Sequence, residues 1–452
     1  MRQQRWFASS SSAAEPVLSC IGMWSLIDHR HQVSLEVHLV LDESTGDPVL
    51  YQVPLSYRSG PLLGGERALI EHATIDGKPV YIYDAPHDPA FTRALLALML
   101  DDESAPGPSY GDTLAEGHHA LVTADVRMTD SHVLRGEQSN TSIVYDLVHP
   151  NGKPAAPVIC KLFRTISDGL NPDVVVQSAL SDAGSRLVPR AIGSISGAWP
   201  DPRQPSGRAT GHLAFAQEFI PEVEDAWRVA LRAAEAEESF AVLARSLGEA
   251  TAQVHLELAA LLPAHPAGAA EVGAVLASMR QRAAAAMAEV PSIADDREAV
   301  EAVFALAEQA SWPDFQRIHG DYHLGQVLAV TGRGWVLLDF EGEPLRPIAE
   351  RSEPDVTLRD VAGMLRSFDY VAGSLAHTAH AEAAREWAHE ARDAFLEGYE
   401  ARSGSELLAQ RALLDAFELD KALYEVTYEA RNRPDWLPIP ATAIPRLAPR
   451  PR

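Results

Sequence analysis

The chain has 452 residues, enough for two or three domains of about 150 residues, which excludes a small disulfide-stapled module. Its 63 acidic and 38 basic residues give a net charge of −25, so we expect no nucleic acid and no membrane as partner. Two cysteines, Cys20 and Cys160, are too few for a disulfide framework. With no apolar signal or spanning segment, the sequence predicts a soluble, cytoplasmic protein.

Hydrophobic periodicity divides the chain into a β-rich first half and a helical second half. Alternating runs predict strands over 32–85, and a helix pattern at 89–100 precedes a turn-rich linker at 103–111. A second group of strands follows over 119–220, with one short helix at 172–183. Beyond Pro221, segments rich in Ala, Leu and Glu at helical period dominate. The sequence therefore predicts an α+β fold with boundaries near residues 105 and 220.

One segment of the helical half carries the residue types of phosphoryl transfer. Asp321 lies in HGDYHLGQV, the amide Gln326 follows at i+5, and Asp339 ends an apolar strand 18 residues after Asp321. Kinases need a carboxylate beside the attacking hydroxyl, and an amide and a second carboxylate for Mg²⁺. Protein kinases use Asp, Asn at i+5 and DFG, whereas here the amide is Gln and DFG is DFE. A lone Asp is more often a turn former, but the ordered set predicts a catalytic Asp321 with Gln326 and Asp339 as metal ligands.

The β-rich half offers candidates for the nucleotide. Lys161 interrupts the apolar run VICKLFR, where a lysine is costly unless it is paired, functional or snorkelling at a sheet edge. About 20 residues earlier, a turn rich in small polar side chains could cover the phosphates, although it lacks G-x-G-x-x-G. AFAQEFIPE reads as a strand leading into a hinge whose backbone contacts adenine. The predicted ATP-binding residues are Gln138, Ser139, Asn140, Thr141, Ser142, Lys161, Glu218 and Phe219.

Seven segments together resemble a known family. They are EQSNTSIV, CKLFR, GLNPD, HGDYHLGQVL, LLDFEGEP, LRDVAGMLRSFDY and ELDKALYEVTYEARNRPDWLPIP, and they look like the maltokinases of actinobacteria. These belong to the aminoglycoside phosphotransferase and choline kinase branch of the protein-kinase-like fold. The resemblance implies a bilobal protein-kinase-like fold with an N-terminal β-rich cap subdomain (1–105), an intermediate ATP-binding N-lobe (106–220) and a helical C-lobe (221–452).

The same resemblance implies an activity and partners. It is the ATP- and Mg²⁺-dependent phosphorylation of maltose at its anomeric hydroxyl, giving maltose 1-phosphate for α-glucan (glycogen) assembly, with an association with trehalose synthase. It adds Glu341 as a third candidate Mg²⁺ ligand and His323 as a sugar or phosphate contact. The chain departs from the family at Val175, where members often carry a carboxylate that pairs with the phosphate lysine. Either Asp173 replaces it, or Lys161 pairs elsewhere.

The last long helix pattern carries a polar and aromatic stripe. Lys421, Tyr424, Glu425, Tyr428 and Asn432 fall at i, i+3, i+4, i+7 and i+11, so they share one helix face. Such a stripe is usually solvated or packed on a neighbour, but polar groups beside aromatic faces also suit a sugar. With the resemblance, the stripe predicts the sugar-binding face.

Other interpretations stay open. A glucosamine or aminoglycoside kinase of the same fold would favour several carboxylates and fewer tyrosines around its acceptor, whereas Lys421, Tyr424 and Tyr428 favour a neutral sugar. A metallohydrolase could use the alternating His319, Asp321 and His323, although that reading leaves Asp339 and Lys161 unexplained. Asp360 and Arg366 are expected to form structural ion pairs that brace the catalytic loop.

Overall fold

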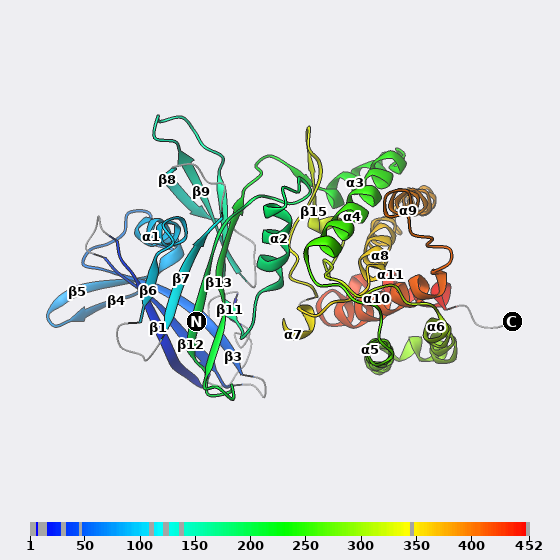
Figure 1. Ribbon diagram of the computed structural model, residues 1–452, viewed down its shortest axis with the longest axis horizontal. Coiled ribbons are helices and arrows are strands. Elements are labelled where there is room, and N and C mark those ends of the chain that lie inside the picture. Colours follow the sequence, from blue (N-terminus) through cyan, green and yellow to red (C-terminus); the bar gives the residue numbers. More distant parts are fainter. Residues whose placement is uncertain are drawn as a thin grey trace. The chain divides into compact units, whose positions relative to one another are not determined.

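The computed structural model describes residues 6–7, 16–28, 33–44, 48–107, 113–120, 126–134, 140–343 and 348–448. It forms two compact units, in which residues 1–182 and 189–221 make the first and residues 183–188 and 222–452 the second. The chain therefore crosses from one unit to the other after residues 182, 188 and 221. Figure 1 shows strands in the blue and green first unit and helices in the second.

The first unit begins with an antiparallel sheet in the order β1-β2-β3-β5-β4, whose strand β3 also pairs with β11. Its strands are β1 (Leu18–Leu26), β2 (Ser34–Asp42), β3 (Val49–Arg58), β4 (Leu69–Ile75), β5 (Lys78–Asp84) and β11 (Thr165–Ile166). Asp76 and Gly77 join β4 to β5, both with φ near the left-handed region (50° and 75°), as a two-residue hairpin turn requires.

A second antiparallel sheet of this unit runs in the order β6-β7-β12-β13-β10-β9-β8. Its strands are β6 (Ser104–Pro106), β7 (Leu114–His119), β8 (Arg127–Val133), β9 (Asn140–Val148), β10 (Val158–Phe163), β12 (Ala191–Pro200) and β13 (Arg208–Glu218). The helical elements are η2 (Ala85–His87), α1 (Pro89–Leu100) and α2 (Pro172–Asp182). Trp24, Leu39, Phe91, Ile143 and Phe215 belong to one buried cluster, so the two sheets and α1 share a hydrophobic core.

The second unit is mainly helical, and α4 and α8 both pack against α9. Its helices are α3 (Ala226–Glu235), α4 (Ala241–Leu261), α5 (Ala269–Glu289), α6 (Arg297–Gln309), α7 (Ile348–Arg351), α8 (Leu358–Ser374), α9 (Ala381–Ser403), α10 (Arg411–Asn432) and α11 (Pro438–Leu447). Short elements are η3 (Pro291–Asp296), η4 (Leu324–Gln326), η5 (Pro434–Trp436), β14 (Glu224–Asp225), β15 (Val327–Val330) and β16 (Gly334–Leu337). The predicted α+β class is confirmed. Among the described helices, none combines the length and the apolar character needed to cross a bilayer.

Helices α4 and α9 approach each other closely at two glycines. A Cβ atom on Gly248 of α4 would lie 2.0 Å from the carbonyl oxygen of Phe395, and one on Gly398 of α9 would lie 2.0 Å from that of Arg245. Both obstacles are backbone atoms, which cannot swing aside. The two helices can therefore pack as they do only if both positions lack a side chain.

Gly248→Ala should lower the free energy of unfolding by about 1–3 kcal/mol, because the added methyl group forces the two helix backbones apart. Chemical denaturation of the full chain measures this change. Gly273 of α5 is the matched control, because a Cβ there meets no atom within 4 Å. Gly273→Ala should therefore stabilise the protein slightly through helix propensity. Equal effects of the two substitutions would contradict the close crossing.

Candidate active site

The loop that contains Asp321 takes its shape from a buried carboxylate on α8. The backbone N–H groups of His319 and Gly320 donate to Oδ2 and Oδ1 of Asp360 at 2.8 and 2.9 Å. The Nε2 atom of His255 lies 3.0 Å from the same Oδ2. Burial by itself would raise the pKa of Asp360, but these hydrogen bonds outweigh it and lower that pKa. The carboxylate therefore stays ionised and fixes the loop to the helix.

Two glycines allow this contact between the loop and α8. Gly320 has a φ of +85°, a conformation that side chains rarely adopt. A Cβ on Gly363 would lie 2.5 Å from the carbonyl oxygen of Tyr322. The loop is further tied to α8 by a hydrogen bond from Leu324 N–H to Ser367 Oγ, 3.1 Å long. The backbone around Asp321 is thus held on both sides.

Asp321 shares a lysine with a second carboxylate. Lys421 Nζ donates to Asp321 Oδ1 at 2.9 Å and to Glu343 Oε1 at 2.8 Å, and it lies 4.8 Å from the centre of the Tyr424 ring. Burial would lower the pKa of Lys421, but the two carboxylates outweigh burial and raise it. The lysine is therefore charged, and its charge is neutralised within the protein. Its N–H bond fixes one oxygen of Asp321.

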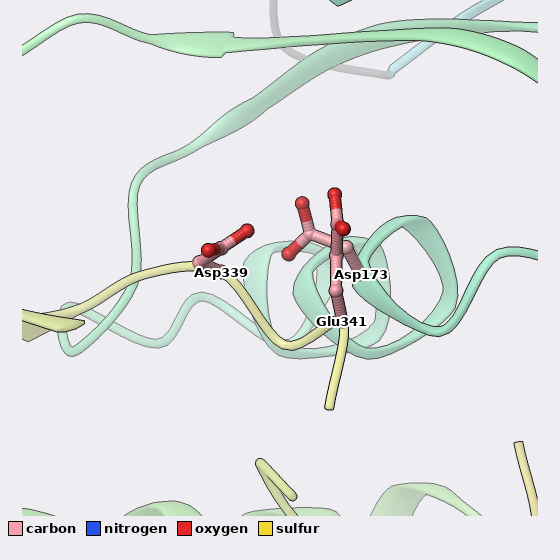
Figure 2. Close-up of side chains that lie close together, drawn as sticks. All are labelled: Asp173, Asp339 and Glu341. Carbon is pink, nitrogen blue, oxygen red and sulfur yellow. The ribbon is translucent and has the colours of Figure 1, made fainter. Parts of the chain in front are cut away.

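The predicted metal ligands of this unit lie around the end of β16. Gln326 Nε2 donates to Asp339 Oδ2 at 3.0 Å, so these two predicted ligands are in contact. Asp339 has a φ of +65°, uncommon for a residue other than glycine and frequent at functional sites. Figure 2 shows Asp339 and Glu341 projecting from the loop after β16. Amide and carboxylate oxygens are the donors that Mg²⁺ prefers, so these side chains fit that ion.

A cavity of about 410 Å³ opens beside Asp321 within the second unit. Its wall contains the residues predicted for catalysis and sugar contact: Asp321, His323, Lys421, Tyr424, Glu425 and Tyr428. Burial lowers the pKa of His323, so the imidazole is neutral at pH 7. Asn432 is not part of the wall, because its side-chain amide turns back to the carbonyl of Tyr428.

The cavity wall also contains residues that the stripe on α10 did not predict. These are Trp227, Gly325, Gly363, Ser367, Tyr370, Glu429, Arg433 and Trp436. Glu429 and Arg433 continue the i+4 spacing from Glu425, so the signal for them was present in the sequence. Trp227 and Trp436 are distant in the chain, and only the tertiary fold places them in this wall.

Aromatic rings and carboxylates dominate this wall. The rings of Tyr424 and Tyr428 are stacked with centroids 6.4 Å apart, and those of Tyr370 and Trp436 with centroids 6.2 Å apart. Glu425 Oε2 accepts from Nε and Nη2 of Arg366 at 3.0 and 2.8 Å. Arg366 therefore braces the wall of this cavity, whereas the sequence suggested that it braces the catalytic loop.

In the first unit, Lys161 has a buried carboxylate partner. Its Nζ atom donates to Asp173 Oδ2 at 2.8 Å, from β10 to the first turn of α2. Gln177, one helical turn later, donates to the other oxygen of Asp173. Asp173 thus takes the place of the missing carboxylate at Val175. The pair holds the lysine side chain in a fixed position.

The other predicted nucleotide contacts are only partly described. Gln138 and Ser139 lie outside the described residues. The sequence placed Asn140, Thr141 and Ser142 in a turn, but β9 already begins at Asn140. Thr141 and Ser142 point to opposite faces of the sheet and are both buried, because both faces of β9 are covered at this point. Thr141 Oγ1 accepts from Arg164 Nε at 2.8 Å.

Glu218 and Phe219 lie where the chain leaves the second sheet. Their N–H groups donate to the carbonyls of Arg190 and Pro157 at 2.8 and 2.9 Å. These two donors are therefore engaged within the first unit, so an adenine contact at this segment would use other backbone groups. Its role as a hinge stays a prediction.

The alternative of a metal site at His319, Asp321 and His323 finds no support within the described residues, where these three do not gather as a metal-binding group. His319 Nε2 lies 2.8 Å from the carbonyl oxygen of Leu338, and its Nδ1 accepts from Asp321 N–H at 3.4 Å. His323 Nδ1 accepts from Gly325 N–H at 3.0 Å. Both ring nitrogens of His319 are thus occupied by the loop itself.

Comparison with known sequences places the chain among sugar kinases. The family model described as the maltokinase N-terminal cap domain matches residues 1–88. A glucosamine kinase of Mycolicibacterium smegmatis (strain ATCC 700084 / mc(2)155) is 30% identical over 415 residues, 85% of this chain and 96% of that protein. A glucosamine kinase of Streptacidiphilus jiangxiensis is 29% identical over 290 residues, 60% of this chain and 64% of that protein.

Solved structures show the same fold. A glucosamine kinase in complex with glucosamine, ADP and inorganic phosphate superposes with a TM-score of 0.68 at 20% identity, covering 97% of this chain and 96% of that one. A crystal form of glucosamine kinase without named ligands gives 0.70 at 20% identity, over 100% and 98% of the two chains. The predicted kinase-like fold is therefore confirmed.

Asp360→Asn should reduce kcat about 100-fold, because an amide cannot accept both loop N–H groups and the position of Asp321 depends on them. The KM for ATP should change little. Steady-state kinetics measure kcat and KM separately. Asp415→Asn, at a half-buried carboxylate of α10 that pairs with Arg411, is the matched control. Retention of normal kcat by the Asp360 variant, with its melting temperature unchanged, would contradict this anchoring role.

Proposed function

Since the chain belongs to the glucosamine kinase family, sugar kinases with the protein-kinase-like fold and a maltokinase-type cap, we propose that it transfers the γ-phosphoryl group of ATP to a hydroxyl of an amino sugar. It is a phosphotransferase that acts on a sugar hydroxyl. The observation that carries the proposal is the acceptor cavity, in which Asp321 lies among carboxylates and aromatic rings while Lys421 is neutralised.

The proposed reaction begins with a sugar hydroxyl beside Asp321. The carboxylate orients this hydroxyl and accepts its proton as the oxygen attacks the γ-phosphorus. The new O–P bond forms while the bond from the γ-phosphorus to the bridging oxygen breaks, and ADP leaves with that electron pair. Because Lys421 binds Oδ1 of Asp321 at 2.9 Å, Oδ2 is the atom that we assign to the sugar hydroxyl.

The remaining predicted residues serve the nucleotide in this proposal. Lys161, held by Asp173 at 2.8 Å, donates to phosphate oxygens. Gln326, Asp339 and Glu341 would hold Mg²⁺ through their oxygen atoms. Bound there, the ion would neutralise the charge of the phosphates. ATP and Mg²⁺ are thus the expected cosubstrate and cofactor.

The charge of the cavity favours an amino sugar. Three carboxylates, Asp321, Glu425 and Glu429, line it against two cations, Lys421 and Arg433. The sequence alone suggested that a lysine beside tyrosines would suit a neutral sugar. That argument loses its force, because Asp321 and Glu343 neutralise the lysine at 2.9 and 2.8 Å. Arg366 pairs with Glu425 and Arg433 with Glu429, so the four carboxylates of these pairs, Glu343 included, exceed the three cations by one. This single excess negative charge favours an ammonium group, while the tyrosine rings can cover the apolar face of a pyranose.

Maltose is the second candidate acceptor, and two observations favour it. The cap model matches residues 1–88, and the stacked Tyr424–Tyr428 and Tyr370–Trp436 pairs offer aromatic surface for a second sugar ring. The product would then be maltose 1-phosphate for α-glucan synthesis, and an association with trehalose synthase would be expected. The carboxylates in the wall give no advantage to this neutral disaccharide.

A panel of acceptors distinguishes the candidates. ATP turnover with Mg²⁺ is measured with glucosamine, glucose, N-acetylglucosamine, maltose and an aminoglycoside, and phosphorus NMR identifies the phosphorylated oxygen. We expect kcat/KM for glucosamine to exceed that for glucose and N-acetylglucosamine at least about tenfold, because only glucosamine carries an ammonium group. A preference for maltose would select the second candidate, and turnover with none of these sugars would contradict a sugar kinase.

Asp321→Asn should reduce kcat by at least about 1,000-fold while the Kd of ADP with Mg²⁺ stays within about twofold of the wild-type value. The substitution removes the proton acceptor and preserves the shape of the side chain. Calorimetric titration with ADP checks the nucleotide site. Near-normal turnover in this variant would show that another group accepts the proton.

A further inference from the structure

A second and larger cavity lies in the helical unit, outside the acceptor site. Its volume is about 830 Å³, and α8, α9, η5 and α11 form its wall. In Figure 1 these helices belong to the yellow-to-red part of the chain. The polar part of the wall consists of Arg366, Asp369, His377, Arg385, His389, Arg392, Asp435 and Arg446. Four arginines and two histidines therefore face two carboxylates, in a protein whose net charge is −25.

The arginines converge on a single carboxylate. Asp369 Oδ2 accepts from Nη1 of Arg366 at 2.8 Å, from Nη1 of Arg392 at 3.3 Å, and from Nη2 of Arg446. Each guanidinium carries five N–H groups, whereas one carboxylate offers two oxygens. Arg392 Nη2 also donates to Oε2 of the buried Glu418 at 3.0 Å. Glu425 also accepts from Arg366, and the carbonyl of Leu365 accepts from Arg392 at 3.1 Å, so the hydrogen-bonding capacity available to a ligand is greatest at the half-exposed Arg446.

Exposed arginines lie beside an apolar wall at the rim of the cavity. Arg446 is half-exposed, and Arg385 has 69% of its side chain exposed. Within the part of the chain that the structure describes, Arg385 has a carboxylate partner at 3.7 Å and donates from Nε to the carbonyl of Ala381 at 3.2 Å. Trp436, Pro438 and Ile439 form an apolar wall next to these cations. Guanidinium groups bind phosphate through paired hydrogen bonds, and an aromatic face suits a sugar ring. The cavity thus combines phosphate donors with a surface for the body of a sugar.

We propose that this cavity binds a phosphate monoester of a sugar, with Arg385, Arg392 and Arg446 as the phosphate ligands and Trp436 against the sugar ring. The shared chemistry is the phosphate group, which a phosphorylated sugar or free inorganic phosphate can supply. The site is distinct from the acceptor cavity, although Trp436 contributes to both walls.

Arg366 connects the two cavities. Its Nη1 binds Asp369 in the second cavity, while its Nε and Nη2 bind Glu425 in the acceptor wall. A phosphate that draws Arg392 and Arg446 away leaves Asp369 to compete more strongly for Arg366. Glu425 is then released toward the acceptor. Occupancy of the second cavity should therefore lower the KM for an ammonium-bearing acceptor, a consequence that rests on the proposed function, whereas the binding itself does not.

Calorimetric titration of the full chain with glucose 6-phosphate, and separately with inorganic phosphate, tests the binding. Mg²⁺ and ADP are present at saturation, so that the nucleotide site is filled. We expect one saturable site that is weakened about tenfold in Arg446→Gln and in Arg385→Gln, because each loses a charged hydrogen-bond donor to phosphate. Tighter binding of glucose 6-phosphate than of inorganic phosphate would identify the sugar ester as the ligand.

The control variant is Arg431→Gln, which removes an exposed arginine of α10 that pairs with Glu289 outside this cavity. It should bind both probes like the wild type. Arg446→Gln should fold, because Asp369 keeps Arg366 and Arg392 as partners, and Arg446→Lys provides a second test that retains the charge. No saturable binding, or binding that none of the cavity variants weakens, would overturn the proposal. Binding with an unchanged acceptor KM would overturn the coupling through Arg366.

Discussion

The buried carboxylate of Asp360 is the interaction on which the candidate site depends. It accepts hydrogen bonds from the N–H groups of His319 and Gly320 at 2.8 and 2.9 Å, and these bonds fix the backbone of the loop before Asp321. Loop backbone normally needs solvent for its polar groups, whereas here a helix supplies the acceptor. Because α8 is packed between α9 and α10, the position of the loop is tied to the core of the whole helical unit.

The second constraint is the charge balance around Lys421. The ammonium group of Lys421 holds Asp321 in position, and Glu343 forms the second ion pair of this lysine. The lysine lies in the cavity wall, but its charge is already neutralised. The groups that remain to contact a ligand are therefore the carboxylates and the aromatic rings. Arg366 on α8 has a similar role, since it neutralises Glu425 and Asp369 together. Arg366 thus joins the walls of the two cavities, because it binds Glu425 in one and Asp369 in the other.

Local patterns in the sequence predicted the α+β division, since strand alternation and helical period are properties of neighbouring residues, while the resemblance to maltokinases implied the kinase-like fold. Contacts between residues that are far apart in the sequence could not be predicted in this way. Lys421 contacts Asp321 across 100 positions in the chain, and no periodicity signals that distance. Lys161 illustrates the same limit, because only the placement of α2 selects Asp173 over Val175 as its neighbour. The turn expected at Asn140–Ser142 is a strand because sheet pairing overrides the turn preference of these small polar residues.

The central claim is that the cavity beside Asp321 receives the sugar with its reactive hydroxyl at the carboxylate. The most direct measurement is a crystal structure of the Asp321→Asn protein with glucosamine, ADP and Mg²⁺. The account predicts one sugar in the cavity, with a hydroxyl within hydrogen-bonding distance of residue 321 and the amino group near Glu425 or Glu429. A sugar bound elsewhere, or one that turns no hydroxyl toward residue 321, would contradict it.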